Sequence, residues 1–206
     1  MVDVVTANNR HRYTALLEQM HRDRKTVFVD RFKWDIPVID GQFEIDQFDN
    51  ADAIYLMALD PRRQRHLGSV RLLPSTGSHL LGDIFPHLCE KGVPAAPDVW
   101  EITRLLTTPA KDVDPRPTHM QIIMALCEFG LLYGIRQYTC VVHMHLLSAL
   151  LALGWECEPL GEPQLIAGDM CGALAINITP ATLQLFRDRA QSRVPVLQLS
   201  DIAEAA

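Results

Sequence analysis

Pro97-Asp98-Val99-Trp100-Glu101-Ile102-Thr103-Arg104-Leu105-Leu106 is predicted to form a central strand of the protein. Successive side chains of a strand point to opposite faces. Val99, Glu101, Thr103 and Leu105 are therefore expected on one face, and Trp100, Ile102, Arg104 and Leu106 on the other. Burying an unpaired charge is strongly unfavourable. We therefore expect Glu101 and Arg104 each to have an ionic partner or a ligand.

The composition indicates one globular domain spanning residues 1–206, with a loosely held tail after about residue 195. The chain has 206 residues, of which 48% are hydrophobic and 21% charged, and no low-complexity linker divides it. The net charge of -6 disfavours nucleic acid as a partner, because phosphate neutralisation needs clustered Lys and Arg. The longest apolar run, over 146–155, is shorter than the roughly 20 residues that span a bilayer, so no membrane association is expected.

Cysteine and histidine usage predicts a cytoplasmic protein without a metal site. The five cysteines are odd in number and form no CxxC pair, and no apolar signal segment follows Met1, which favours reduced thiols. Of the eight histidines, only His143 and His145 are close neighbours, and no acidic residue lies between them. We therefore expect no metal.

The order of predicted elements indicates an α/β fold with a mixed sheet and helices on both faces. A helix capped by Asn8 or Asn9 is expected from about residue 10 to residue 28, and a long loop covers 33–49. Strands are expected over 53–59 and 64–73, joined by a Pro61 turn. In the second half of the chain, we expect a helix over 119–133 capped by Thr118, a strand over 137–142 and a helix over 146–153. Strands over 155–158 and 170–178 are expected to follow, and then a helix from Thr179-Pro180 to residue 189.

Several familiar sites are absent from the sequence. There is no GxxxxGK[ST], no Gly-rich strand-to-helix fingerprint and no GxSxG elbow. What remains is a set of charged and aromatic residues within otherwise apolar or aromatic surroundings: Arg24, Asp46, Asp49, Arg71, Glu101, Arg104, Phe28, Trp34 and Phe85. A ligand with a carboxylate, cationic groups and a flat ring would use all of these side-chain types.

These residues resemble the acyl-homoserine-lactone synthases, the autoinducer synthases of bacterial quorum sensing. The matching positions are Arg24 and Phe28 in Arg-x-x-x-Phe, Trp34, Glu44-Ile45-Asp46-Gln47-Phe48-Asp49, Arg71, Phe85, Trp100-Glu101-Ile102-Thr103-Arg104 and Gly154-Trp155. Their order and spacing agree over roughly the first three quarters of the chain. The resemblance implies a GNAT-like acyltransferase fold (an α+β sandwich) with a largely antiparallel sheet and a V-shaped cleft between two central strands.

The resemblance also implies a reaction. An acyl thioester acylates the amine of S-adenosylmethionine, and the methionyl carboxylate then closes a lactone and expels methylthioadenosine. Arg24 and Arg104 would hold the carboxylate or the adenosyl end, Asp46 and Asp49 would meet the ammonium and sulfonium charges, and Phe28, Trp34 and Phe85 would bind the substrate. Arg71 would pair with a loop acid, Asp46 above all. S-adenosylmethionine is a substrate here, so no cofactor is expected.

The amine must lose a proton before it attacks, and Glu101 is the predicted base, directly or through a water. Glu101 and Arg104 are thus the predicted catalytic residues. A backbone N–H near Leu105 or Leu106 is expected to stabilise the oxyanion.

The acyl donor is expected to be acyl-coenzyme A rather than acyl carrier protein. Relatives that use the acidic carrier protein have Arg or Lys before Gly-Trp, whereas residues 140–155 contain neither. Lys111, Arg116 or Arg136 can serve either carrier. Plausible walls of the acyl pocket, although plain core is the favoured interpretation for each, are Met124, Leu126, Cys140, Val142, Leu146, Leu150 and Ile176. They do not specify the acyl chain.

Two other functions stay open at this point. One is a ligand sensor of GNAT-like fold without turnover, although a sensor need not keep Glu101 and the complete loop. The other is a GNAT acetyltransferase for a different amine, which would carry a Gly-rich pyrophosphate loop. Residues 107–118 contain no glycine.

Overall fold

The computed structural model describes residues 1–199, which divide into two compact units. The first unit comprises residues 1–71 and 104–126 and the segment from Pro195, and the second comprises residues 72–103 and 127–194. Three elements run through both units: strand β5 (His66–Pro74), strand β6 (Val99–Thr107) and helix α3 (Pro115–Tyr133). The expectation of a single domain remains a prediction.

The sheet of the first unit has the strand order β11-β1-β4-β5-β6. β1 (Val2–Val5) pairs antiparallel with β4 (Ile54–Leu59) and parallel with β11 (Leu197–Gln198). β1 was not among the predicted strands, and its four residues are all buried. The Val2 N–H donates to the Val196 carbonyl at 2.8 Å, so the start of the tail is hydrogen-bonded to the sheet. The predicted loose tail otherwise falls largely on residues 200–206, outside the described part.

The first predicted helix is divided into three pieces. A 3₁₀ turn (Arg10–Arg12) precedes α1 (Thr14–Arg24), and a π-helical segment (Lys25–Arg31) follows it. The predicted asparagine cap is wrong, because the Asn9 side chain instead accepts from the Thr6 N–H and donates to the Val4 carbonyl. Asn9 therefore fixes the end of β1, and the α-helix begins four residues later than expected. π-Helical segments are rare and occur frequently at functional sites.

The predicted long loop contains a small hairpin. β2 (Val38–Ile39) pairs antiparallel with β3 (Phe43–Glu44). Asp40 and Gly41 turn the chain with φ of 52° and 65°, conformations that Asp and Gly tolerate better than most residues. The hairpin sets the start of the acidic segment that follows it.

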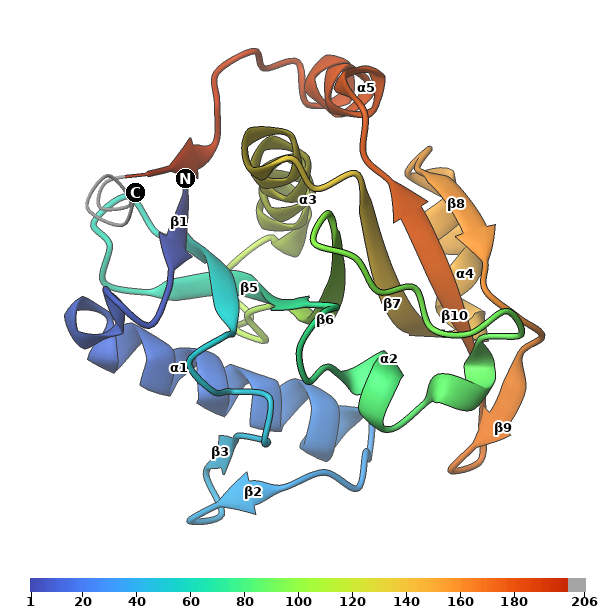
Figure 1. Ribbon diagram of the computed structural model, residues 1–206. Coiled ribbons are helices and arrows are strands. Elements are labelled where there is room, and N and C mark those ends of the chain that lie inside the picture. The colour runs from blue at the N-terminus through green and yellow to red at the C-terminus, as the bar shows by residue number, and fades with distance from the viewer. Residues whose placement is uncertain (200–206) are drawn as a thin grey trace. The chain divides into compact units, whose positions relative to one another are not determined.

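Helices cover opposite faces of the sheet in the first unit, as Figure 1 shows for α1 and α3 on either side of β5. On one face, the Asp23 carboxylate of α1 lies 2.7 Å from Nδ1 of His66 on β5. On the other, Gly68 allows close packing, since a Cβ there would lie 2.8 Å from the Leu106 carbonyl oxygen and 2.9 Å from Cγ2 of Thr118 on α3. The predicted Thr118 cap is wrong. α3 begins at Pro115, a favoured first helical residue, and the Asp114 carboxylate accepts from the Arg116 N–H.

The second unit continues the strand order as β5-β6-β7-β10-β8, with β9 also paired to β10. β10 (Asp169–Asn177) pairs antiparallel with β7 (Gln137–His143), β8 (Glu156–Pro159) and β9 (Gln164–Ile166). β6 and β7 are parallel, and they pair only from Val99–Glu101 to Gln137–Thr139 although β7 continues to His143. The pairing ends early, as the predicted parting of two central strands requires.

The helices of the second unit also lie on both faces. The Trp100 ring contacts Phe129 of α3 edge-on at 6.3 Å, whereas the Glu101 carboxylate accepts from backbone N–H groups of α2 (Leu80–Asp83). This confirms the prediction that Trp100 and Glu101 lie on opposite faces. A 3₁₀ turn (Pro86–Leu88), α4 (Met144–Ala152) and α5 (Pro180–Ala190) complete the unit. Thr179 caps α5 by accepting from the Thr182 N–H, as predicted. The predicted mixed, largely antiparallel sheet is confirmed.

Residues 1–199 contain neither a helix that could span a membrane nor a group of side chains that could hold a metal ion. None of the helices there is long and apolar enough to cross a membrane. Within the same range, no three His, Cys, Asp or Glu side chains are grouped so that they could hold a metal ion.

Candidate active site

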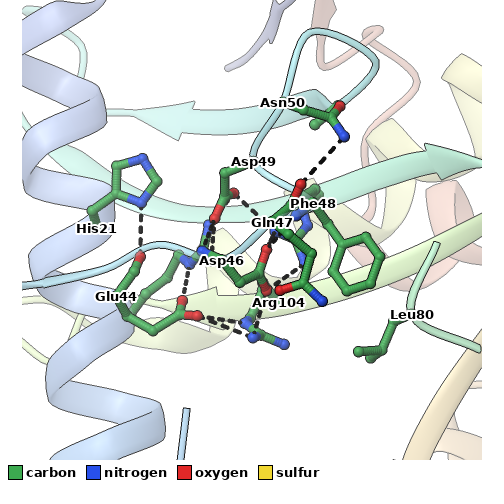
Figure 2. A network of polar contacts seen from close by, with 12 residues as sticks. His21, Glu44, Asp46, Gln47, Phe48, Asp49, Asn50, Leu80 and Arg104 are labelled. Carbon is green, nitrogen blue, oxygen red and sulfur yellow. Dashed lines mark hydrogen bonds and ion pairs between the residues drawn. The ribbon is translucent and has the colours of Figure 1, made fainter. Parts of the chain in front are cut away.

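Three arginines and three carboxylates form one buried cluster in the first unit. Its members come from α1, β5, β6 and the segment after β2, and they are Arg24, Glu44, Asp46, Asp49, Arg71 and Arg104. Figure 2 shows the Glu44 carboxylate facing the guanidinium group of Arg104. We call this set the six-charge cluster. The structure thus brings together five predicted site residues, and adds Glu44.

Asp49 is the most heavily contacted acid of the six-charge cluster. Its Oδ1 accepts from Arg24 at 2.7 Å and from the Tyr55 hydroxyl at 2.8 Å, and forms an ion pair with Nη1 of Arg71 at 2.9 Å. Its Oδ2 accepts from Arg24 at 3.0 Å and from the Asp46 N–H at 2.9 Å. Burial alone would raise the pKa of Asp49, but the neighbouring Arg24 and Arg71 lower that pKa well below its ordinary value. Asp49 is therefore a permanent carboxylate.

Arg24 and Arg71 are almost completely buried. Arg24 donates to Glu44 as well as to Asp49, and although burial opposes the charge, these carboxylates raise the pKa of Arg24 above its ordinary value. Arg71 forms a bidentate pair with Asp46, at 2.6 and 3.0 Å. The predicted Arg71–Asp46 pair is confirmed.

Glu44 is the site residue that the sequence analysis did not select. Glu44 lies two positions before Asp46, at the start of the acidic segment 44–49, and its side chain is fully buried. Its carboxylate accepts from both Arg24 and Arg104, so it joins α1 to β6. The alternation of acids at positions 44 and 46 was the available signal, because alternate residues of an extended segment share a face.

Arg104 adopts a left-handed backbone conformation in the middle of β6, with φ of 53°. This region is unfavourable for residues other than Gly, Asn and Asp, and such outliers concentrate at functional sites. The predicted alternation of β6 side chains between the two faces of the sheet therefore does not hold beyond Thr103. Leu106 nevertheless packs with Val27 and Phe28.

Arg104 has N–H groups that donate to no residue in the described range. Its Nε donates to Glu44 at 3.2 Å, and its Nη2 donates to Glu44 at 3.0 Å and to Asp46 at 2.8 Å. A guanidinium has five N–H donors, so both hydrogens of Nη1 remain without an acceptor among residues 1–199. Arg104 and Asp46 are also the most exposed side chains of the six-charge cluster, at 7% and 5%.

Two aromatic rings lie against Arg104. Phe28 and Trp34 stack with their centroids 4.8 Å apart and their planes at 14°. The Arg104 guanidinium carbon lies 5.6 Å from the Phe28 centroid and 5.9 Å from that of Trp34, within cation–π range. The structure thus brings Phe28, Trp34 and Arg104 together, as predicted.

Two further side chains support the cluster. The Tyr55 hydroxyl donates to Asp49, and burial together with that carboxylate raises the pKa of Tyr55 above its ordinary value. Nδ1 of His21 lies 2.9 Å from the Glu44 carbonyl oxygen, as Figure 2 shows. Burial and the nearby charge of Arg24 lower the pKa of His21, although Asp49 and Glu44 act in the opposite direction. Neutral His21 therefore donates to the carbonyl and fixes β3 on α1.

Glu101 and Phe85 belong to the second unit. Glu101 is fully buried, and its two carboxylate oxygens accept from the Leu80 and Leu81 N–H groups, each at 2.7 Å. Phe85 packs against a core cluster that includes Leu81, Leu88 and Ala173. Glu101 is therefore held in one position by backbone.

The predicted acyl-pocket residues are mostly buried, but they do not form a single set. Met124 is in the first unit, whereas Cys140, Val142 and Ile176 are in the second and share one face of its sheet, because Cys140 lies opposite Leu174 and Val142 opposite Gly172. Glu101 pairs with Thr139 and thus faces the opposite side. Leu146 is 42% exposed and Leu150 partly exposed, so Leu146 fits a pocket wall poorly.

All five cysteines are free thiols in the structure. Burial raises the pKa of Cys127 and of Cys140 to about 12. Burial likewise raises the pKa values of Cys89, Cys157 and Cys171. A thiolate nucleophile is therefore disfavoured at every cysteine.

The mixed sheet with helices on both faces and a parallel pair of strands whose pairing ends after three residues defines a GNAT-like fold, and its first unit carries the six-charge cluster. The fold alone is shared with a candidate N-acetyltransferase from Lactobacillus plantarum, at a TM-score of 0.55 and 15% identity. The autoinducer synthase family profile matches residues 8–182. The chain belongs to this family of acyl-homoserine-lactone synthases.

Individual relatives agree with this assignment. The isovaleryl-homoserine lactone synthase of Bradyrhizobium diazoefficiens is 33% identical over 92% of this chain and 85% of its own length. The structure of BjaI, described as a CoA-dependent acyl-homoserine lactone synthase with SAM and isopentyl-CoA, has a TM-score of 0.88 at 32% identity, covering 96% of this chain and 92% of BjaI. MesI, also described as CoA-dependent, has a TM-score of 0.85 at 30% identity, covering 96% and 98%. The family assignment favours an acyltransferase over the ligand sensor and over an acetyltransferase for another amine.

Proposed function

We propose that this protein acylates the amine of S-adenosylmethionine from an acyl-coenzyme A thioester and then closes the lactone with release of methylthioadenosine. The observation that carries this proposal is Arg104, whose Nη1 donors remain available beside two stacked aromatic rings. A guanidinium edge suits a carboxylate, and aromatic faces suit a sulfonium or an adenine. S-adenosylmethionine combines these groups in one molecule.

The six-charge cluster is proposed to orient this substrate more than to contact it. Asp49 and Arg24 are buried and bound to each other, which favours a role in holding the loop and Arg104 in place. The more exposed Asp46 is the better candidate to meet the ammonium group. Phe28 and Trp34 would cover the adenosyl end, and direct contact by Arg24, Asp49, Arg71 or Phe85 remains a prediction.

The first chemical step forms an amide. Once the ammonium group has lost its first proton, the neutral amine attacks the thioester carbon, the C–S bond breaks, and the departing thiolate takes the second proton from nitrogen, so that coenzyme A leaves as its thiol. Glu101 is proposed to accept the amine proton through a water, because backbone N–H groups already hold both of its oxygens. The peptide N–H groups of Leu105 and Leu106, next to the left-handed Arg104, are proposed to face the oxyanion.

The second step closes the ring. An oxygen of the methionyl carboxylate attacks the γ-carbon, the bond from that carbon to the sulfonium sulfur breaks, and methylthioadenosine leaves with the electron pair. No base is needed in this step, because the carboxylate is already ionised and the sulfonium is a good leaving group. Arg104 would hold the carboxylate until it turns toward the γ-carbon. No resident cofactor is proposed, since S-adenosylmethionine is consumed.

The acyl chain is proposed to pass between β6 and β7. Their pairing ends at Glu101 and Thr139, and Cys140, Val142 and Ile176 lie beyond this point on the face opposite Glu101. A chain that enters on the Glu101 side would reach these residues only by passing between the strands. Met124, Leu126, Leu146 and Leu150 remain weaker predictions.

Coenzyme A is proposed as the acyl carrier. The helix α4 and its flanks, over 140–155, contain no Lys or Arg to attract an acidic carrier protein. BjaI and MesI, two of the most similar structures, are both described as CoA-dependent. The free cysteines suit the reducing cytoplasm, where we propose that the reaction takes place.

One assay tests the function. The purified protein is incubated with S-adenosylmethionine and a panel of acyl-coenzyme A thioesters, and methylthioadenosine and the acyl product are measured by mass. We expect both in equal amounts, and only with a thioester present. Absence of methylthioadenosine with every thioester on both carriers would refute the function. Equal or faster turnover with the same acyl group on acyl carrier protein would refute only the choice of carrier.

Glu101→Gln tests the base. The amide keeps an acceptor oxygen but accepts no proton, so we expect turnover to fall about 100-fold while S-adenosylmethionine binding, measured by calorimetry, changes little. A Glu101→Gln variant with wild-type turnover would remove Glu101 as the base.

A further inference from the structure

His79 is a buried histidine next to the backbone that holds Glu101. It directly precedes α2, and only 5% of its surface is exposed. The two residues that follow it, Leu80 and Leu81, supply the N–H groups that bind the Glu101 carboxylate. His79 therefore lies at the start of the turn that positions the proposed base.

The hydrogen bonds of the imidazole fix its tautomer. Nδ1 of His79 lies 2.8 Å from the Gly77 carbonyl oxygen, which can only accept, so Nδ1 carries the proton. In the neutral ring, Nε2 is then an acceptor. Nε2 is buried and has no hydrogen-bond partner among the described residues.

Gly82 leaves the space that the His79 imidazole occupies. A Cβ on Gly82 would lie 2.5 Å from Cε1 and 2.8 Å from Nε2 of His79, so only glycine at position 82 leaves room for this edge of the imidazole. A buried acceptor without a partner is unfavourable and uncommon in native proteins. An apolar side chain would fill the same space without that penalty.

We propose that Nε2 of His79 accepts a hydrogen bond from the water through which Glu101 takes the proton of the substrate amine. This inference rests on the proposed function. A buried water needs at least two polar partners, and Glu101 is bound by the N–H groups of the two residues that directly follow His79. His79 is thus a positioning residue for the acylation step, and its loss should lower kcat without weakening substrate binding.

Two amide variants separate this role from a role in the turn. Asn can reproduce the Nδ1–H donor to Gly77 but offers no acceptor at the Nε2 position, whereas Gln can place its oxygen near that position. We expect His79→Asn to lower kcat about tenfold or more, with KM for S-adenosylmethionine within about twofold of wild type. His79→Gln should recover most of the loss. A His79→Asn variant with wild-type kcat, or one that is more active than His79→Gln, would overturn the proposal.

A measurement on the wild-type protein keeps the test independent of how the variants fold. A high-resolution crystal structure with methylthioadenosine should show a water at about 2.7–3.2 Å from Nε2 that also contacts Glu101. An Nε2 with no atom in that range would overturn the inference. If the wild-type protein releases no methylthioadenosine in the activity assay, the proposed function itself has failed. If it does and His79→Asn is unaffected, only the role of His79 has failed.

Discussion

Arg104→Lys provides a sharp test of the proposed substrate site. Arginine at this position uses three N–H donors for Glu44 and Asp46 and keeps two on Nη1. Lysine keeps the positive charge, so the buried acids are not left without a cation. It also has a Cβ, so the unfavourable φ of 53° is the same in both proteins. What lysine lacks is the planar fork that contacts Glu44, Asp46 and a substrate carboxylate at once.

The expected loss follows from these contacts. At least one charge-assisted hydrogen bond to the substrate disappears, and such a bond contributes about 1.5–3 kcal/mol. Because Arg104 is almost completely buried, solvent screening does not reduce this figure much. A difference of this size lowers kcat/KM for S-adenosylmethionine by about 10- to 150-fold. The assay is the initial rate of methylthioadenosine release at varied S-adenosylmethionine and saturating thioester.

Arg65→Lys is the matched control. Arg65 also forms a bidentate pair, with Asp112 at 3.0 and 3.2 Å, but both side chains are about half exposed or more. Exposed pairs contribute little, so we expect its kcat/KM to stay within about twofold of wild type. The reasoning is refuted if Arg104→Lys is folded, as judged by its thermal transition, and its kcat/KM also stays within about twofold.

Two further predictions concern stability. The pKa of Asp49 is lowered in the folded protein, so the contribution of its carboxylate to the free energy of unfolding is complete above the unfolded pKa of about 4 and is lost as the pH falls below that value. Asp49→Asn should therefore be less stable than wild type at pH 7. In urea titrations, the variant should lose less of its free energy of unfolding than wild type does between pH 5 and pH 3. Equal pH dependence in the two proteins would contradict this. His66 joins α1 to β5 through Asp23 at 2.7 Å and Ser69 at 3.0 Å, so His66→Ala should lower the free energy of unfolding by about 2 kcal/mol or more, whereas substitution of the exposed His11 should not.

The residues of the site were predictable because their chemistry is unusual for their positions. Arg71 and Arg104 interrupt strands of apolar residues, and a buried guanidinium needs a carboxylate. The acids had to come from the segment after Trp34, the nearest part of the chain rich in both acids and aromatics. The Arg71–Asp46 pair followed from the family likeness, and the structure confirms it.

Other features depended on contacts between distant parts of the chain. β1 contains only four residues, and its buried Asp3 is compensated by Tyr13 and Arg63, which no local pattern reveals. The left-handed conformation of Arg104 breaks the simple alternation of a strand, and no local pattern predicts it because local preference disfavours it. Glu44 was overlooked since its burial depends on two arginines from different elements.

The balance of charge in the site limits how the substrate can bind. Three guanidinium groups and three carboxylates offset each other, and two buried members, Arg24 and Asp49, are bound to one another through two hydrogen bonds. A substrate that replaced one of these partners would leave a buried charge unpaired, which is strongly unfavourable. Binding is therefore easiest where a donor is still unused, at Nη1 of Arg104. The cationic sulfonium is then best placed over the Phe28 and Trp34 rings, which attract it without breaking an existing ion pair.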